Sequence, residues 1–76
     1  MIKEYIKDNK YKLLIEENTI SIRNYINIED ITNTIIKVKL SNINILIKGN
    51  NLIINKLDSY DLKISGIFKG IEFTNE

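Results

Sequence analysis

The segment IIKVKLSNINILIK, residues 35–48, decides the fold because apolar and polar side chains alternate on both sides of the polar pair Ser41-Asn42. A period of two is typical of a strand with one buried face. A two-residue turn at Ser41-Asn42 sets Val38 opposite Ile45, so that the apolar faces of the two strands coincide. This segment therefore predicts an antiparallel hairpin.

Two further turns follow from the same test of register. A turn at residues 17–18 sets Ile15 opposite Ile20, again with matching apolar faces. A turn at Gly49-Asn50 suits type II′, in which glycine adopts the positive φ of the first turn residue without strain. Each of these turns predicts another hairpin.

A weaker turn signal and two slips in the apolar phase complete the pattern. A turn at residues 33–34 sets Asp30 opposite Lys37, where the two charges would form a cross-strand ion pair. The apolar phase slips near residues 29–30 and again at Gly66. An extra residue at a β-bulge reconciles such a slip, so we expect bulges at both places.

These segments predict an all-β domain over residues 11–76, an antiparallel meander of seven or eight short strands. The strands are expected at residues 11–16, 19–25, 26–32, 34–41, 43–48, 51–57, 61–65 and 67–74. So many strands in so short a chain must curl into a small barrel or fold into a two-layer sandwich. A short β-solenoid is the alternative, because apolar residues recur every nine or ten positions at Ile45, Ile54, Ile64 and Phe73.

Residues 1–10 are expected to lie outside this domain as a tail or a short helix. Ile2, Tyr5 and Ile6 have the i, i+3, i+4 spacing of a helical turn. Helices shorter than about 12–15 residues are marginal on their own. No apolar run in the chain exceeds three residues, so we expect neither a signal peptide nor a spanning helix, and a soluble cytoplasmic protein.

The composition excludes several kinds of site chemistry. Eleven basic and ten acidic residues leave a net charge of +1, so no global field would recruit nucleic acid or an anionic membrane. His and Cys are absent, which excludes disulfides, thiol nucleophiles, imidazole bases and the common zinc sites. The acidic pairs, Glu16-Glu17 and Asp58 with Asp61, fall in predicted turns. We expect no catalytic residue, no cofactor and no metal.

The face opposite the predicted core carries one apolar pair among polar residues. The turn at residues 49–50 would set Leu46 opposite Ile53 on this face. One interpretation is a second core layer beneath the N-terminal hairpin, and the other is a docking patch, since exposed apolar clusters mark protein interfaces. Leu46 and Ile53, together with Tyr25 and Tyr60, are the candidate partner-contact residues.

Binding of single-stranded nucleic acid is the main alternative function. Small β-barrels stack bases on aromatic side chains that lie beside basic residues. The side chains available for this are Tyr11, Tyr25, Tyr60, Phe68, Phe73, Lys12, Arg23, Lys37, Lys39 and Lys63. Because the charges nearly balance and Phe73 falls in phase with the core, we do not expect nucleic acid as a partner.

Three segments together resemble the YabP/YqfC family of sporulation proteins. The first, ISIRNYINI at residues 20–28, is similar to a family stretch ending in Asn-(His/Tyr)-x-x-(Ile/Leu). The second, ILIKGNNLIINKL at residues 45–57, resembles I-x-(R/K/E)-G-x-x-L-x-I-x-x-L. The third, LKISGIFKGIEF at residues 62–73, resembles L-x-I-x-G-x-I-x-x-I-x-(Y/F). Their order and spacing agree over about 60 of the 76 residues, and Asn24-Tyr25 favours the YqfC-like branch.

The resemblance implies a non-enzymatic structural or adaptor protein made in the mother cell of endospore-forming bacteria. Family members act in spore formation or coat assembly and are typically paired with an integral-membrane partner. The resemblance thus implies a cytoplasmic protein held at the outer forespore membrane by that partner. Open strand edges would also allow self-association or pairing with a partner's strand through main-chain hydrogen bonds.

Overall fold

The computed structural model describes residues 11–75, and the expectation for residues 1–10 lies outside this part of the chain. All its regular elements are strands: β1 (Lys12–Ile15), β2 (Thr19–Arg23), β3 (Asn27–Ile31), β4 (Ile35–Lys39), β5 (Ile43–Leu57) and β6 (Asp61–Asn75). They form one antiparallel sheet in the order β1-β2-β6-β5-β4-β3. The prediction of an all-β domain is confirmed for residues 11–75, with six strands in place of seven or eight.

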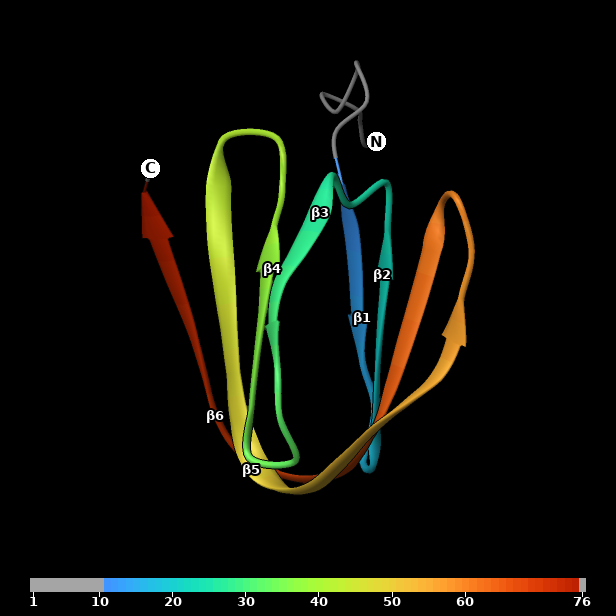
Figure 1. Cartoon of the computed structure of the whole chain (residues 1–76), viewed down its shortest axis with the longest axis vertical. Helices are drawn as coiled ribbons and strands as arrows, with labels where there is room; N and C mark the ends of the chain where they lie inside the picture. The colour runs from blue at the N-terminus through green and yellow to red at the C-terminus, as the bar shows by residue number, and fades with distance from the viewer. Residues whose placement is uncertain (1–10, 76) are drawn as a thin grey trace, which may run out of the picture.

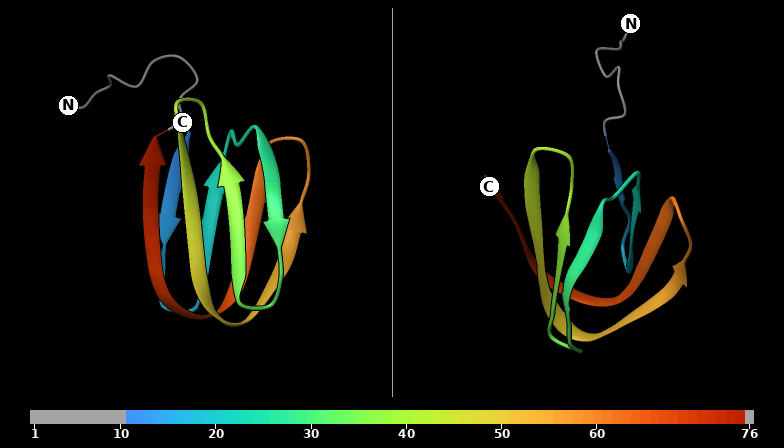
Figure 2. Two further views of the ribbon diagram at one scale, coloured as in Figure 1. Left: turned by 60° about the vertical axis from the view of Figure 1, so that its left-hand side comes forward. Right: turned by 45° about the horizontal axis from the view of Figure 1, so that its top comes forward.

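The sheet bends across its two longest strands, β5 and β6, so that it has two arms (Figure 1). The β1 arm consists of β1, β2, residues 61–65 of β6 and residues 53–57 of β5. The β3 arm consists of β3, β4, residues 43–50 of β5 and residues 67–75 of β6. The arms form the two layers seen in Figure 2, and the sheet is not closed into a barrel. The solenoid alternative is wrong, because every pair of neighbouring strands is antiparallel.

The core lies between the two arms and is entirely aliphatic. Its buried side chains are Ile20, Ile22, Ile36, Val38, Leu40, Ile45, Ile47, Leu52, Leu62 and Ile64. Strands β2 and β6 supply it from the β1 arm, and β4 and β5 supply it from the β3 arm. Because alternate residues of a strand point to opposite faces, the apolar period of the sequence defines the inner face of both layers.

Three predicted turns are confirmed by the strand register. At residues 17–18 and 41–42 the flanking strands pair Ile15 with Ile20 and Val38 with Ile45. At residues 33–34 the hydroxyl oxygen of Thr32 accepts a hydrogen bond from the N–H of Ile35 at 2.9 Å. Local alternation was sufficient for these hairpins because each pairs residues that are close in sequence.

The expected bulge near residues 29–30 is also present, and it changes the ion pair. The register slips between Ile28 and Asp30, so Asp30 pairs with Lys37 as expected. The carboxylate nearest to the Lys37 Nζ is that of the bulged residue Glu29, at 3.7 Å. Asp30 therefore lies at the predicted position opposite Lys37, but the carboxylate that reaches Lys37 belongs to the adjacent residue, Glu29.

The predicted turn at Gly49-Asn50 is wrong, since β5 continues through both residues. Gly49 pairs with Phe68 and does not have a positive φ; the positive φ of 54° belongs to Asn51. Local alternation fits a tight hairpin as well as it fits a bent strand. The bent strand forms because β6 supplies a partner along the whole length of β5.

The irregularity at Gly66 is confirmed in position, although the extra residue is on the facing strand. Asn50 pairs with Ile67 and Ile53 with Ser65, so two β5 residues face Gly66 alone. Gly66 has a φ of 148°, and a Cβ there would lie 2.8 Å from the carbonyl oxygen of Asn51. Glycine is needed here because the backbones approach closely where the sheet bends.

The meander order is wrong at one place, because β2 pairs with β6 and not with β3. Asn24 follows β2 with a φ of 65°, a left-handed conformation that turns the chain out of the strand direction. Its N–H donates to the carbonyl oxygen of Tyr60 at 2.8 Å. The chain then crosses to the β3 arm, where the N–H of Ile26 donates to the carbonyl oxygen of Lys39 at 2.8 Å.

Candidate functional site

The structure separates the predicted apolar pair of Leu46 and Ile53. Because β5 does not turn back on itself, Leu46 lies in the β3 arm between Lys37 and Glu72. Ile53 lies in the β1 arm, and its side chain is 58% exposed. The expected pairing is therefore wrong, and the two residues belong to the outer faces of different layers.

Tyr25 and Tyr60, by contrast, lie together at one end of the β1 arm. The hydroxyl group of Tyr25 donates to the carbonyl oxygen of Asp58 at 2.6 Å, and the N–H of Asn24 donates to the carbonyl oxygen of Tyr60. Tyr25 is half-buried against the core, whereas Tyr60 is 67% exposed. Tyr25 thus holds the β5–β6 turn, and the ring of Tyr60 is open to a partner.

The β5–β6 turn is organised by the carboxylate of Asp58. Its Oδ1 accepts the N–H groups of Tyr60 at 3.0 Å and of Asp61 at 2.8 Å. These backbone hydrogen bonds, that from Asp61 first, lower the pKa of Asp58 below its usual value because they stabilise the charged form. This turn places Asp61 at the start of β6.

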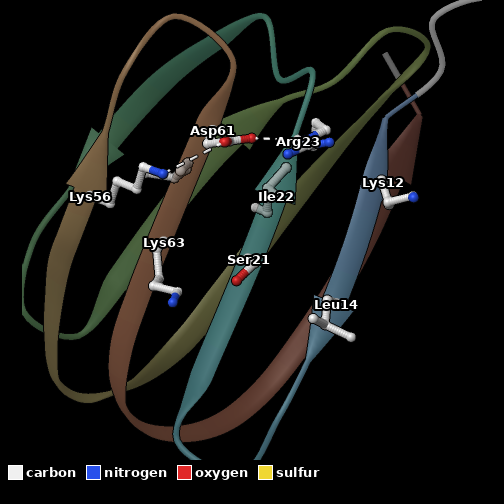
Figure 3. A pocket seen from close by; sticks show the side chains of 9 residues that line it. Lys12, Leu14, Ser21, Ile22, Arg23, Lys56, Asp61 and Lys63 are labelled. Atoms are coloured by element: carbon white, nitrogen blue, oxygen red, sulfur yellow. Dashed lines mark hydrogen bonds and ion pairs between the residues drawn. The ribbon is translucent and has the colours of Figure 1, made fainter.

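Charged and polar side chains of the β1 arm line a groove of about 330 Å³ on its outer face (Figure 3). We call this groove the basic groove. Its lining residues are Lys12, Leu14, Ser21, Ile22, Arg23, Lys56, Asp61, Leu62 and Lys63. The register arranges the outward-facing ones in two rows across the strands. One row is Lys12, Arg23 and Asp61, and the other is Leu14, Ser21, Lys63 and Lys56.

One side of the basic groove is neutralised by Asp61. Its Oδ1 accepts a hydrogen bond from Arg23 Nε at 3.0 Å, and its Oδ2 lies 3.8 Å from Lys56 Nζ. The hydrogen bond and the charge of Asp61 raise the pKa of Arg23 further. Among residues 11–75 no carboxylate lies within ion-pair distance of Lys12 or Lys63. The groove is therefore cationic around Ser21, between these two lysines.

The basic groove contains some of the side chains that the sequence offers for nucleic-acid binding. Lys12, Arg23 and Lys63 lie in it, whereas Lys37 and Lys39 lie on the outer face of the β3 arm. None of its lining residues is aromatic. The groove as a site was missed by sequence reasoning, because it requires β2 to pair with β6; only its β1–β2 half follows from the local hairpin.

The margins of the sheet are open and expose side chains that are in phase with the core. These side chains are Ile15, Ile31, Leu57 and Phe73. Within the described part of the chain, no strand pairs with the outer edges of β1 and β3, or with that of residues 67–75 of β6. Such edges present free backbone groups to which another strand can bond.

Two other kinds of feature are absent from residues 11–75. No three acidic side chains converge there in a way that could hold a metal ion. No helix there is long and apolar enough to cross a bilayer.

Comparison with known proteins gives one match. No curated protein and no solved structure is significantly similar to this chain. The model of the YabP family matches residues 7–76, a range that includes all six strands. The match does not separate the branches of the family, so the YqfC-like assignment stays a prediction. Because the match covers nearly the whole sequence, the chain belongs to the YabP family.

Proposed function

We propose that this protein is a non-enzymatic adaptor of the mother cell that acts in spore formation or coat assembly by docking on an integral-membrane partner. Membership of the YabP family links the chain to sporulation. The observation that supports an adaptor role is the open sheet, whose edge strands are bonded on one side only within residues 11–75 and expose apolar side chains that are in phase with the core. A strand from a partner or a second copy could bond to such an edge.

Two further features support docking by this small domain. The exposed ring of Tyr60 stands on a turn held by Asp58 and Tyr25, so little conformational entropy would be lost on binding there. Ile53 adds an exposed aliphatic side chain on the outer face of the β1 arm. Aromatic and aliphatic anchors of this kind supply much of the binding energy of protein interfaces.

Imaging of a fluorescently tagged copy through growth and sporulation of the source organism tests the proposal. We expect signal to appear only in the mother cell and to gather on the forespore envelope. Diffuse signal during vegetative growth would contradict a sporulation adaptor. A membrane protein crosslinked to the tagged copy in sporulating cells would identify the partner.

Single aspartate substitutions locate the docking face, because the two candidate residues lie on different arms. Ile53→Asp places a charge on the β1 arm and Leu46→Asp on the β3 arm. Asn42→Asp, at an exposed site in the turn between β4 and β5, is the matched control. We expect Ile53→Asp to fold and to reduce crosslinking to the partner, with Asn42→Asp unchanged. Unchanged crosslinking in Ile53→Asp would exclude that part of the β1 arm from the interface.

Binding of single-stranded nucleic acid is a second candidate, favoured by the gathering of Lys12, Arg23 and Lys63 in the basic groove. Stacking on an aromatic side chain supplies about 1–3 kcal/mol per base in such proteins, and no groove residue offers it. Salt-dependent, saturable binding of oligothymidylate would favour this candidate. No binding near physiological ionic strength would retire it.

A further inference from the structure

We infer that the basic groove binds an extended, acidic segment of another protein. The inference rests on the proposed adaptor function and deepens it by naming the chemistry of the partner. It is carried by the charge of the groove, the spacing of its lysines and the apolar side chain at its margin.

The charge of the groove is local, because the chain as a whole is almost neutral at +1. Four cationic side chains from four strands line the groove with one carboxylate, that of Asp61. Asp61 is occupied by Arg23 and Lys56, so Lys12 and Lys63 are the groove cations that have no carboxylate partner among residues 11–75. Ser21 pairs with Lys63 across β2 and β6, so a carboxylate placed there would meet that lysine and the hydroxyl group.

The spacing of the lysines favours a ligand with several separate anionic groups. Lys12 and Lys63 are two strands and two residues apart, which is about 12 Å between Cα positions at ordinary strand spacings. Side chains two residues apart in an extended chain are separated by about 7 Å and share one face. Two carboxylates at this spacing could each meet one flexible lysine, whereas a single phosphate could not occupy both ends.

Leu14 distinguishes a protein segment from other polyanions. Its side chain is 54% exposed and lies in the same row as Ser21 and Lys63. A peptide can set an apolar side chain against Leu14 beside its carboxylates. A nucleic acid would need an aromatic platform, which the groove lacks, and a bilayer surface would not enter a hollow between two rows of side chains. The expected motif is acid-x-acid next to an apolar residue.

Titration of the full-length protein with short peptides tests the inference. The probe is a blocked peptide that alternates Glu and Val, and the matched probe has Gln at every Glu position. We expect saturable binding of the Glu peptide, followed by ¹⁵N NMR, with shift changes at the amides of Lys12, Ser21 and Lys63. Equal binding of the Gln peptide, or shift changes confined to another face, would overturn the inference.

Charge reversal at two lysines of the same strand separates specific contact from general attraction. Lys63→Glu changes the groove, whereas Lys69→Glu changes an exposed lysine of β6 outside it, with the same change in net charge. We expect Lys63→Glu to weaken binding of the Glu peptide about tenfold or more. Lys69→Glu should weaken the same binding less than about twofold. Equal losses of affinity in the two variants would mean that the peptide is attracted by the general charge of the protein, and would overturn the inference.

Oligothymidylate and vesicles that contain phosphatidylglycerol are the competing ligands in the same assay. If either binds more tightly than the Glu peptide and loses binding in Lys63→Glu, the groove serves that ligand and the inference fails. Because the assay uses purified protein, its failure is distinct from failure of the adaptor proposal. Peptide binding in the assay with no sporulation-specific signal in cells would support the inference about the groove and contradict the proposed function.

Discussion

At the scale of single residues, two glycines of one hairpin have different requirements. A Cβ at Gly49 would lie 2.1 Å from the carbonyl oxygen of Ile67 and 3.1 Å from Leu52 Cδ2. A Cβ at Gly70 would have no neighbour within 4 Å. Glycine at position 49 is thus required by the close approach of two strands, and position 70 is open to substitution.

Gly49→Ala is expected to lower the free energy of unfolding by about 2 kcal/mol or more, because the methyl group would force the strands apart. Gly70→Ala is the matched control and should change stability by less than about 1 kcal/mol. Urea denaturation of both variants measures the difference. Similar unfolding midpoints would contradict the close approach at Gly49.

The lowered pKa of Asp58 predicts a contribution to acid sensitivity. Its carboxylate is stabilised by two backbone N–H groups in the folded state. This stability is fully present above the usual aspartate pKa of about 3.9 and is lost as the pH falls through the lowered folded value. Asp58→Asn keeps an acceptor and removes the titration, so its stability should fall less steeply in that window.

Unfolding midpoints of the wild type and Asp58→Asn, compared between about pH 2 and pH 5, measure this effect. A direct NMR titration of the Asp58 carboxyl carbon gives the folded pKa. A value at or above the usual aspartate range would be inconsistent with the two hydrogen bonds.

At the scale of elements, β5 and β6 decide the architecture because each contributes to both layers. Their ladder slips at three places: between Lys48 and Gly49, between Asn50 and Ile53, and between Ile54 and Lys56. Extra residues at such slips bend a strand and increase its local twist. The two strands therefore pass from one arm to the other and pair again beyond each slip.

Asn51 is expected to be important for this bend, since its φ of 54° is left-handed. Asn51→Val should lower the free energy of unfolding by about 1–2 kcal/mol, because a β-branched residue is strained in this region. Asn50→Val is the control at the adjacent exposed position, which has no positive φ. Thermal unfolding of both variants checks the prediction, and an equal effect of the two would contradict it.

At the scale of the whole molecule, the open sheet predicts a pattern of hydrogen exchange. Residues 71–75 of β6 pair with β5 on one edge only, so every second amide should point outward and exchange rapidly. Amides of β2 and β4, which have neighbours on both sides, should be protected throughout. NMR-detected exchange measures both sets.

Protection of every amide in residues 71–75 would indicate that another strand covers this edge. A dependence of that protection on protein concentration would identify a second copy as the source. This outcome would support the expected self-association through strand edges and would contradict an open edge in the isolated protein.

Most of the inner face could be predicted from sequence, whereas the basic groove could not. The alternation of Ile20 with Ile22 and of Ile45 with Ile47 reports burial directly, because the side-chain period of a strand is two. The position of Lys63 beside Ser21 depends on which distant strand β2 selects. No local pattern specifies that choice, and Lys56 was not expected near Arg23 for the same reason.

The sequence by itself determined the all-β class, three short hairpins, the bulge near Glu29 and the family. The hairpins and the bulge rest on residues that are close in the chain, where apolar phase and turn chemistry have few alternatives, and the family rests on the order and spacing of three segments. Only the tertiary structure decided that β5 continues through Gly49, that β2 pairs with β6 and that the lysines of the β1 arm share a groove. A locally acceptable turn at Gly49-Asn50 gives way to the bent strand because β6 pairs with β5 on both sides of the bend and the two strands enclose one core between the arms.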